Sequence, residues 1–132
     1  MKALDTSVLI KYVAKEKRNS TGLLFSFYEK YPERAQFFVN NVVLTEITGQ
    51  LEENIKFDKF HIVGVIEELL VSKKIVLQNS SVIQGALDIY KIRNQSFSEC
   101  LKEVLNNEHN CKETLKATER KAQSASYSIL AG

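Results

Sequence analysis

Four acidic side chains have the surroundings of a shared chemical site. Asp5 ends the first predicted strand, and Glu46 lies early in the helix that follows the second. Glu99 lies in the first turn of its predicted helix, and Glu119 directly follows a weak predicted strand. Strand-to-helix corners of a parallel α/β sheet gather at one edge of the sheet. We therefore expect these four carboxylates to lie close together.

Four carboxylates at one edge would repel one another, so they would need a cation. Hard oxygen ligands suit Mg²⁺ or Mn²⁺, which keep several waters and take other ligands from carboxylates and substrate phosphates. Such a metal activates water for the displacement at a phosphodiester, and a carboxylate with a raised pKa can serve as general base. The alternative is that these acids only favour the helix dipole, each contributing about 0.3–1 kcal/mol.

The elements that must position these acids follow from the hydrophobic pattern. The run Ala3-Leu4 stops at Asp5, and Thr6 and Ser7 can cap a helix whose apolar pattern resumes at Val8. Further strands are predicted over 36–39, 75–77, 114–117 and 127–130. Further helices are predicted over 23–31, 42–51, 57–74, 80–90 and 96–107, with a possible short one at 118–121.

Two of these helices have recognisable starting residues. Ser80 or Ser81 can cap the helix after the strand 75–77, and Ser96 with Glu99 forms a capping box. The alternation of short strands with helices predicts an α/β fold, a three-layer α/β/α sandwich around a mostly parallel central sheet. Residues 1–132 show no linker, so we expect a single domain.

Composition excludes several classes of protein. The 132 residues are 44% hydrophobic and carry 18 basic against 16 acidic side chains, a net charge of +2 that is too balanced to indicate nucleic-acid binding by bulk charge. The longest apolar runs fall short of the ~20 residues of a membrane span, and Asp5 interrupts any signal peptide. Two cysteines and two distant histidines make neither a disulfide framework nor a zinc site. These features favour a cytoplasmic protein without membrane contact.

Four segments resemble the blocks of the PIN-domain ribonucleases. The first, Leu4-Asp5-Thr6-Ser7-Val8, is similar to the family's opening strand followed by Asp-Thr-Asn or Asp-Thr-Ser. The segment 38–47, which ends in Thr45-Glu46-Ile47, resembles the block in which a strand leads into a helix with a fixed Glu. Segments 96–101 and 114–120 resemble the third and fourth blocks. The resemblance covers nearly the whole chain, and the length matches the small stand-alone members, many of which are VapC-type toxins.

The resemblance implies a PIN-like fold and a metal-dependent endoribonuclease that cleaves single-stranded RNA. Carried over to this chain, it makes Asp5, Glu46 and Glu99 the ligands of Mg²⁺ or Mn²⁺, with Glu119 as a fourth catalytic acid. Ser7 matches the position that supports the first acid. The toxins of this family pair with an antitoxin protein and commonly form homodimers, so the resemblance implies both partners here.

Basic residues near the predicted corners are candidates for contacts with RNA. Arg93 precedes the third block, and Arg120 follows Glu119. An RNase needs cations near its phosphates, so we expect these two arginines to contact RNA.

Two alternative readings remain. Glu99 and Glu119 stand where the family usually has Asp, and Mg²⁺ demands near-ideal octahedral geometry. The chain is therefore also compatible with a catalytically weakened or inactive PIN-fold protein that binds or regulates. A third reading is an unrelated α/β domain whose acids only cap helices.

Overall fold

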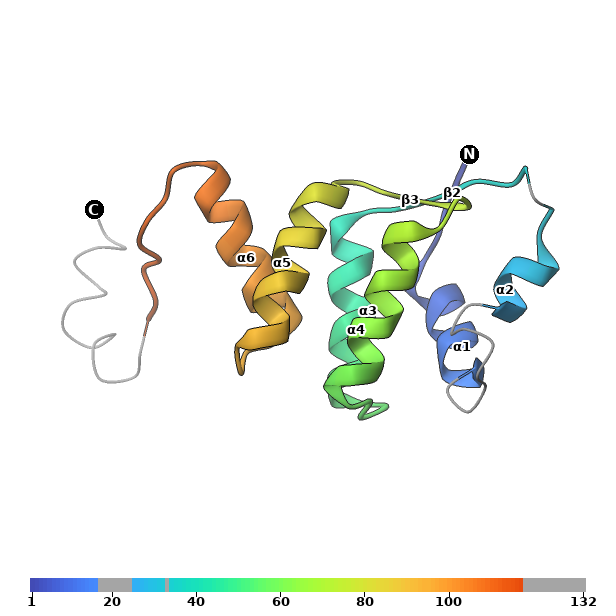
Figure 1. The fold of residues 1–132 in the computed structure, drawn as a ribbon, viewed down its shortest axis with the longest axis horizontal. Coiled ribbons are helices and arrows are strands. Elements are labelled where there is room, and N and C mark those ends of the chain that lie inside the picture. The colour runs from blue at the N-terminus through green and yellow to red at the C-terminus, as the bar shows by residue number, and fades with distance from the viewer. Residues whose placement is uncertain (17–24, 33, 118–132) are drawn as a thin grey trace.

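The computed structural model describes residues 1–16, 25–32 and 34–117. Its strands and helices alternate along the chain (Figure 1). The elements are β1 (Lys2–Ala3), α1 (Thr6–Glu16), α2 (Phe25–Lys30), β2 (Phe37–Val39), α3 (Asn41–Glu53), α4 (Lys59–Val71), β3 (Ile75–Leu77), α5 (Ser80–Ile92) and α6 (Phe97–Glu108). No helix in these ranges is long and apolar enough to span a membrane.

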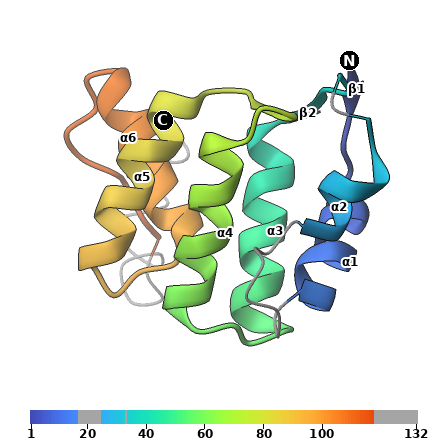
Figure 2. The same cartoon turned by 45° about the vertical axis from the view of Figure 1, so that its right-hand side comes forward.

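The three strands form one parallel sheet in the order β1-β2-β3. Phe37 of β2 pairs with Lys2 on one side and with Ile75 on the other. The helix pairs α1–α2 and α3–α4 connect successive strands, as parallel pairing requires. The predicted α/β class with a parallel sheet flanked by helices is therefore confirmed. Figures 1 and 2 both show α3 between α1 and α6.

Side-chain caps fix where three helices begin. Asn40 Oδ1 accepts a hydrogen bond from the Val43 amide at 2.8 Å at the start of α3. Ser96 Oγ accepts from the Glu99 amide at 3.2 Å at the start of α6, which confirms this half of the predicted capping box. Asp58 caps α4 in the same way. These bonds satisfy amide groups that have no partner within their own helix.

The predicted cap of α5 is wrong. Neither Ser80 nor Ser81 is the capping residue, because both already belong to the helix. Asn79 takes the position before them, and its side chain makes no capping hydrogen bond. The chain passes directly from β3 through Gln78 into α5. The backbone amide of Gln78 donates a hydrogen bond to the Val39 oxygen of the neighbouring strand, so pairing in the sheet sets where α5 begins.

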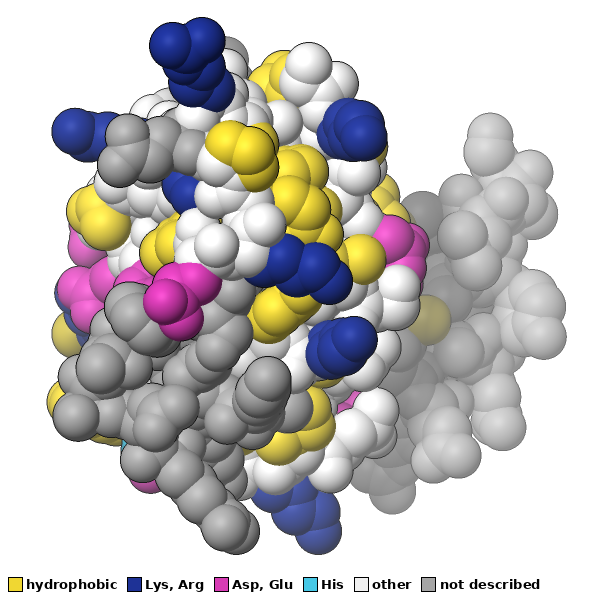
Figure 3. All heavy atoms as spheres, turned by 90° about the vertical axis from the view of Figure 1, so that its right-hand side faces the viewer, with side chains coloured by type: hydrophobic (Ala, Val, Ile, Leu, Met, Phe, Trp, Pro, Cys, Tyr) yellow, Lys and Arg dark blue, Asp and Glu magenta, His cyan; other side chains and the backbone are white. Residues whose placement is uncertain are grey.

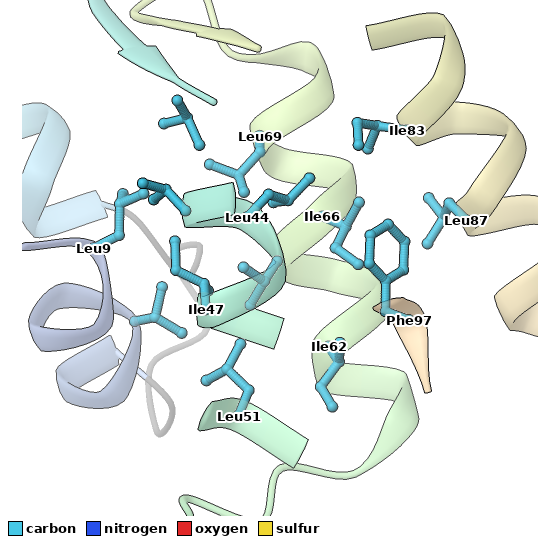
Figure 4. Close-up of a cluster of buried hydrophobic side chains, with 14 of the residues drawn as sticks. Leu9, Leu44, Ile47, Leu51, Ile62, Ile66, Leu69, Ile83, Leu87 and Phe97 are labelled. Atoms are coloured by element: carbon cyan, nitrogen blue, oxygen red, sulfur yellow. The ribbon is translucent and has the colours of Figure 1, made fainter. Parts of the chain in front are cut away.

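One continuous hydrophobic core joins the sheet to the helices. Figure 4 shows side chains from α1, α3, α4, α5 and α6 meeting in it. The largest fully buried side chains are Phe27, Phe97, Leu9, Leu44, Ile47, Leu51, Ile62, Ile66, Leu69, Ile83 and Leu87. At ~25 cal/mol per Å² of buried apolar surface, residues of this kind provide most of the stabilisation of the fold.

The expected strand over 114–117 is wrong, because these residues adopt no regular secondary structure. Leu115, the long apolar side chain of the segment, is 68% exposed. Asn106 of α6 donates to Thr114 Oγ1 at 3.2 Å, so the segment contacts α6 and not the sheet. A strand needs a neighbour that pairs with its backbone, and this exposed segment has none among the described residues. The expected elements at 118–121 and 127–130 lie outside the described residues.

Candidate functional site

Asp5 lies where β1 ends and α1 begins. Its Oδ2 atom accepts two hydrogen bonds from Ser7, one from the backbone amide at 3.0 Å and one from Oγ at 2.5 Å. The Ser7 hydroxyl, followed by the Ser7 amide, lowers the pKa of this exposed carboxyl below its ordinary value of 3.8. The bonds cap α1, and they also hold Asp5 as a fixed anion. A carboxylate offers about four lone-pair sites, so this arrangement leaves capacity for a cation.

Glu46 lies on the exposed face of α3, in the second turn. The opposite face of this helix is fixed in the core by Val43, Leu44, Ile47 and Leu51. Because α3 packs against both α1 and α6, Glu46 lies on the element between α1, which begins directly after Asp5, and α6, which carries Glu99.

Glu99 reaches its position by a different route from the one expected. Its helix α6 follows α5 and not a strand, so the expectation of a strand-to-helix corner is wrong here. The first amide of α6, from Phe97, donates to Glu52 Oε2 at 3.3 Å. Glu52 is in the last turn of α3, six residues beyond Glu46, a rise of about 9 Å along a helix. The start of α6 thus lies near the end of α3 that is distant from the sheet.

Two lysines surround the carboxylate of Glu99. Lys102 Nζ lies 3.1 Å from Oε1, and Lys116 Nζ lies 4.0 Å from Oε2. These three residues and Lys112 line a cleft of about 670 Å³ between α6 and the segment that follows it. The cleft therefore combines two partly buried acids, Glu99 and Glu103, with three ammonium groups, a charge pattern that suits a phosphate-containing ligand near an acid.

The described residues do not gather the expected acids into a preformed metal cluster. Among residues 1–16, 25–32 and 34–117, no three His, Cys, Asp or Glu side chains are grouped so that they could hold one metal ion. Glu119 and Arg120 lie outside these ranges. The entry of α6 at the end of α3 that is distant from the sheet explains why Glu99 does not complete a group with Asp5 and Glu46.

Arg93, the described candidate for RNA binding, ends α5. Its Nη1 lies 2.5 Å from Glu103 Oε2, and its backbone oxygen accepts a hydrogen bond from Lys59. Its side chain is 47% exposed, so it remains accessible to a ligand. On the face of the molecule beside α2 and the sheet, Lys and Arg side chains are spread out and form no single stripe in the coloured part of Figure 3. RNA contact by Arg93 stays a prediction.

Sequence reasoning missed the lysines around Glu99. The spacing of Glu99 and Lys102, three residues apart in a predicted helix, is a signal for an ion pair that was available in the sequence. Lys116 carried no such signal, because its contact depends on how the segment after α6 returns along that helix. Glu52 had no signal in the sequence either, because its hydrogen-bond partner Phe97 is 45 residues away.

Comparison with known proteins gives one informative likeness. The chain is similar to a VapC ribonuclease of Aquifex aeolicus (strain VF5), with 29% identity over 104 residues. These residues make up 79% of this chain and 77% of the relative. No protein-family model matches the sequence, and no solved structure matches it. This distant likeness agrees with the family resemblance of the sequence motifs.

The residues present fit a hard divalent cation in their chemistry. Asp5 has a lowered pKa, and its hydrogen bonds from Ser7 use only one of its two carboxylate oxygens. Glu46 is an exposed carboxylate on α3, which packs against α1. Mg²⁺ is commonly held by one or two carboxylates together with waters and substrate phosphates, so a group of three protein acids is not required.

Proposed function

We propose that this protein is a PIN-like, metal-dependent endoribonuclease of the VapC type, the toxin of a toxin–antitoxin pair. The observation that carries the proposal is the likeness to a VapC ribonuclease over about four-fifths of the chain. The chemistry of Asp5 supports it, because a carboxylate at the carboxyl end of a parallel strand, held ionised by Ser7, suits a cation. An unrelated α/β domain would leave the likeness unexplained.

In this proposal Asp5, Glu46 and Glu99 would hold Mg²⁺ or Mn²⁺, with Glu119 as a fourth catalytic acid. The bound metal would activate a water and neutralise charge on the phosphodiester of single-stranded RNA. Ser7 orients Asp5 and keeps it charged. Glu99 would have to exchange its lysine partners for the cation, which would release Lys102 and Lys116 toward the phosphates of the RNA.

The proposal includes partners and surroundings. The toxin type implies a cognate antitoxin protein and a homodimer, and a toxin that acts on RNA belongs in the cytoplasm. Arg93 and Arg120 are the proposed arginine contacts to RNA, beside the lysines of the cleft.

The proposal is tested by cleavage of a mixed set of single-stranded and structured RNAs with Mg²⁺, Mn²⁺ or EDTA. Wild type is compared with Asp5→Asn and with the control Asp88→Asn. Asp88 is an exposed acid on α5 that accepts a hydrogen bond from the Gln84 side chain, and the amide oxygen of an asparagine can accept the same bond. We expect metal-dependent cleavage by wild type and Asp88→Asn, and none by Asp5→Asn. Circular dichroism establishes that each variant is folded. Equal cleavage by Asp5→Asn would contradict the mechanism.

A second candidate function is a PIN-fold binding or regulatory protein with a weakened site. The pairing of Glu99 with Lys102 and the lack of a three-acid group in the described part of the chain favour it. Its discriminating experiment is the double change Glu99→Asp and Glu119→Asp. Cleavage that appears or increases strongly after these changes would favour the second candidate, and wild-type cleavage that the changes do not increase would contradict it.

A further inference from the structure

A glycine interrupts the exposed stripe of α3 beside Glu46. The stripe follows helical spacing through the exposed residues Val42, Glu46 and Glu53, and Gly49, which falls in the same spacing, is half-buried. Gly49 lies three residues after Glu46, so the two positions are neighbours on the helix surface, about 4.5 Å apart along the axis. The stripe belongs to the helix between α1 and α6, as Figures 1 and 2 show.

Neither packing nor backbone geometry accounts for this glycine. A Cβ atom built on Gly49 would meet no described atom within 4 Å, whereas one on Gly85 of α5 would meet Val104 Cγ1 at 3.5 Å. The backbone of Gly49 does not adopt the left-handed conformation that favours glycine. Glycine in a helix interior is less favourable than alanine, so Gly49 lowers the stability of α3 without a structural gain among the described residues.

We propose that Gly49 provides clearance for the sugar–phosphate backbone of single-stranded RNA as it crosses α3 next to Glu46. This inference rests on the proposed ribonuclease function and assigns the path of its substrate. An RNA strand can bring a phosphodiester to Glu46 only if its backbone approaches the surface of α3 closely. Gly49, about one turn away, has no side chain and so permits that approach. Gly49 is thus a substrate-positioning residue that contributes no chemical group.

The test uses Gly49→Ala and Gly49→Leu, with Gly85→Ala as the matched control. Alanine at either position should raise the melting temperature by about 3 °C, because both glycines lie within helices. Gly49→Ala should raise KM for single-stranded RNA about tenfold with little change in kcat, and Gly49→Leu should raise it further. Gly85→Ala should leave KM at the wild-type value.

Binding of labelled single-stranded RNA to the same variants in an Asp5→Asn background gives a second readout without cleavage. Affinity should fall from Gly49 to Ala to Leu and stay unchanged for Gly85→Ala. Wild-type KM and affinity in Gly49→Leu would overturn the inference while leaving the ribonuclease function intact. A lower melting temperature in Gly49→Ala would also overturn the inference, because it would show that the alanine methyl group clashes with another part of the protein. A wild type that neither binds nor cleaves RNA would overturn the proposed function first.

Discussion

Asp5 and Ser7 form the hydrogen-bonded pair on which the proposed metal site depends. Two hydrogen bonds from one serine fix an exposed carboxylate at the end of a strand. The same bonds begin α1, so a structural cap and a proposed metal ligand are one arrangement. Capping alone would be served equally by Asn, which is comparable to Asp as a capping residue but has no charge for a cation. The charge of Asp5 is therefore the property that separates the two roles.

Ser7→Ala should raise the pKa of Asp5 toward its ordinary value of 3.8. The Ser7 hydroxyl is the largest cause of the lowered pKa, and the hydrogen bond from the backbone amide of residue 7, 3.0 Å in wild type, remains in the variant. A lowered pKa contributes stability that is present above the ordinary value and is lost as pH falls through the lowered one. Ser7→Ala should therefore reduce this contribution. A ¹³C carboxyl titration by NMR measures the pKa, and an unchanged Asp5 in the variant would contradict the assigned cause.

At the scale of elements, long-range side-chain bonds fix helices whose own sequences are short or polar. Lys74, just before β3, donates through Nζ to the backbone oxygens of Tyr28 and Tyr31, both at 2.7 Å. A cation at the C-terminal end of a helix satisfies free carbonyl groups and complements the helix dipole. The six residues of α2 thus depend on a residue more than forty positions away.

Lys74→Ala should lower the free energy of unfolding by about 2 kcal/mol, because two charge-assisted hydrogen bonds to backbone oxygens are lost. Lys73→Ala is the control, since Lys73 is exposed, and it should change stability by less than about 0.5 kcal/mol. Urea unfolding measures both variants. Equal effects of the two changes would show that Lys74 does not hold α2.

Glu52 provides a second test at the scale of elements, since it anchors the start of α6. Its Oε2 atom accepts from the Phe97 amide and, at 3.4 Å, from the Tyr90 hydroxyl. Burial raises its pKa above the ordinary value of 4.5. A raised pKa means that its favourable contribution is fully present below the ordinary value and is lost as pH rises through the raised one.

Wild type should therefore lose stability relative to Glu52→Gln as pH rises above the ordinary value of 4.5, because the amide keeps an acceptor oxygen without a charge. Urea unfolding of both proteins at a series of rising pH values measures the difference, and the comparison cancels the titration of other groups. A wild type that gains stability relative to Glu52→Gln as pH rises would contradict the raised pKa of Glu52.

Local sequence patterns predicted most helices and strands. The elements that the sequence did not predict depend on contacts between residues far apart in the chain. The apolar run at 75–77 and the cap at Ser96 are local signals, and both are confirmed. The segment 114–117 has residues compatible with a strand, but it contacts α6 and is exposed. In the candidate site, the bond between Ser7 and Asp5 could be predicted because it spans two residues. The entry of α6 near Glu52 could not, since it depends on how α5 and α6 pack.

At the scale of the whole molecule, the core is continuous from α1 to α6, and we propose that the chain is one folding unit. Ile66 of α4 is fully buried near the middle of this core. Ile66→Ala should lower the free energy of unfolding by about 2–5 kcal/mol while preserving one cooperative transition. Circular dichroism and tyrosine fluorescence should give coincident unfolding curves, and two separated transitions would contradict a single unit.

The relation among Asp5, Glu46 and Glu99 determines how the protein could hold a metal ion. The described residues hold no three-acid group, so a bound cation must coordinate fewer protein groups or draw Glu99 from its lysines. Like charges separate when no cation is present, and a cation reverses that balance. Metal binding should therefore depend on acids that come from different elements of the fold.

Electron paramagnetic resonance can follow the binding of Mn²⁺ to wild type, Asp5→Asn, Glu46→Gln and Asp88→Asn. Asp88 lies on α5 and serves as the control for charge alone. We expect one Mn²⁺ site in wild type and Asp88→Asn, with affinity at least about tenfold weaker in Asp5→Asn and in Glu46→Gln. Mn²⁺ bound equally by all four proteins, or by none of them, would contradict a metal site built on Asp5 and Glu46.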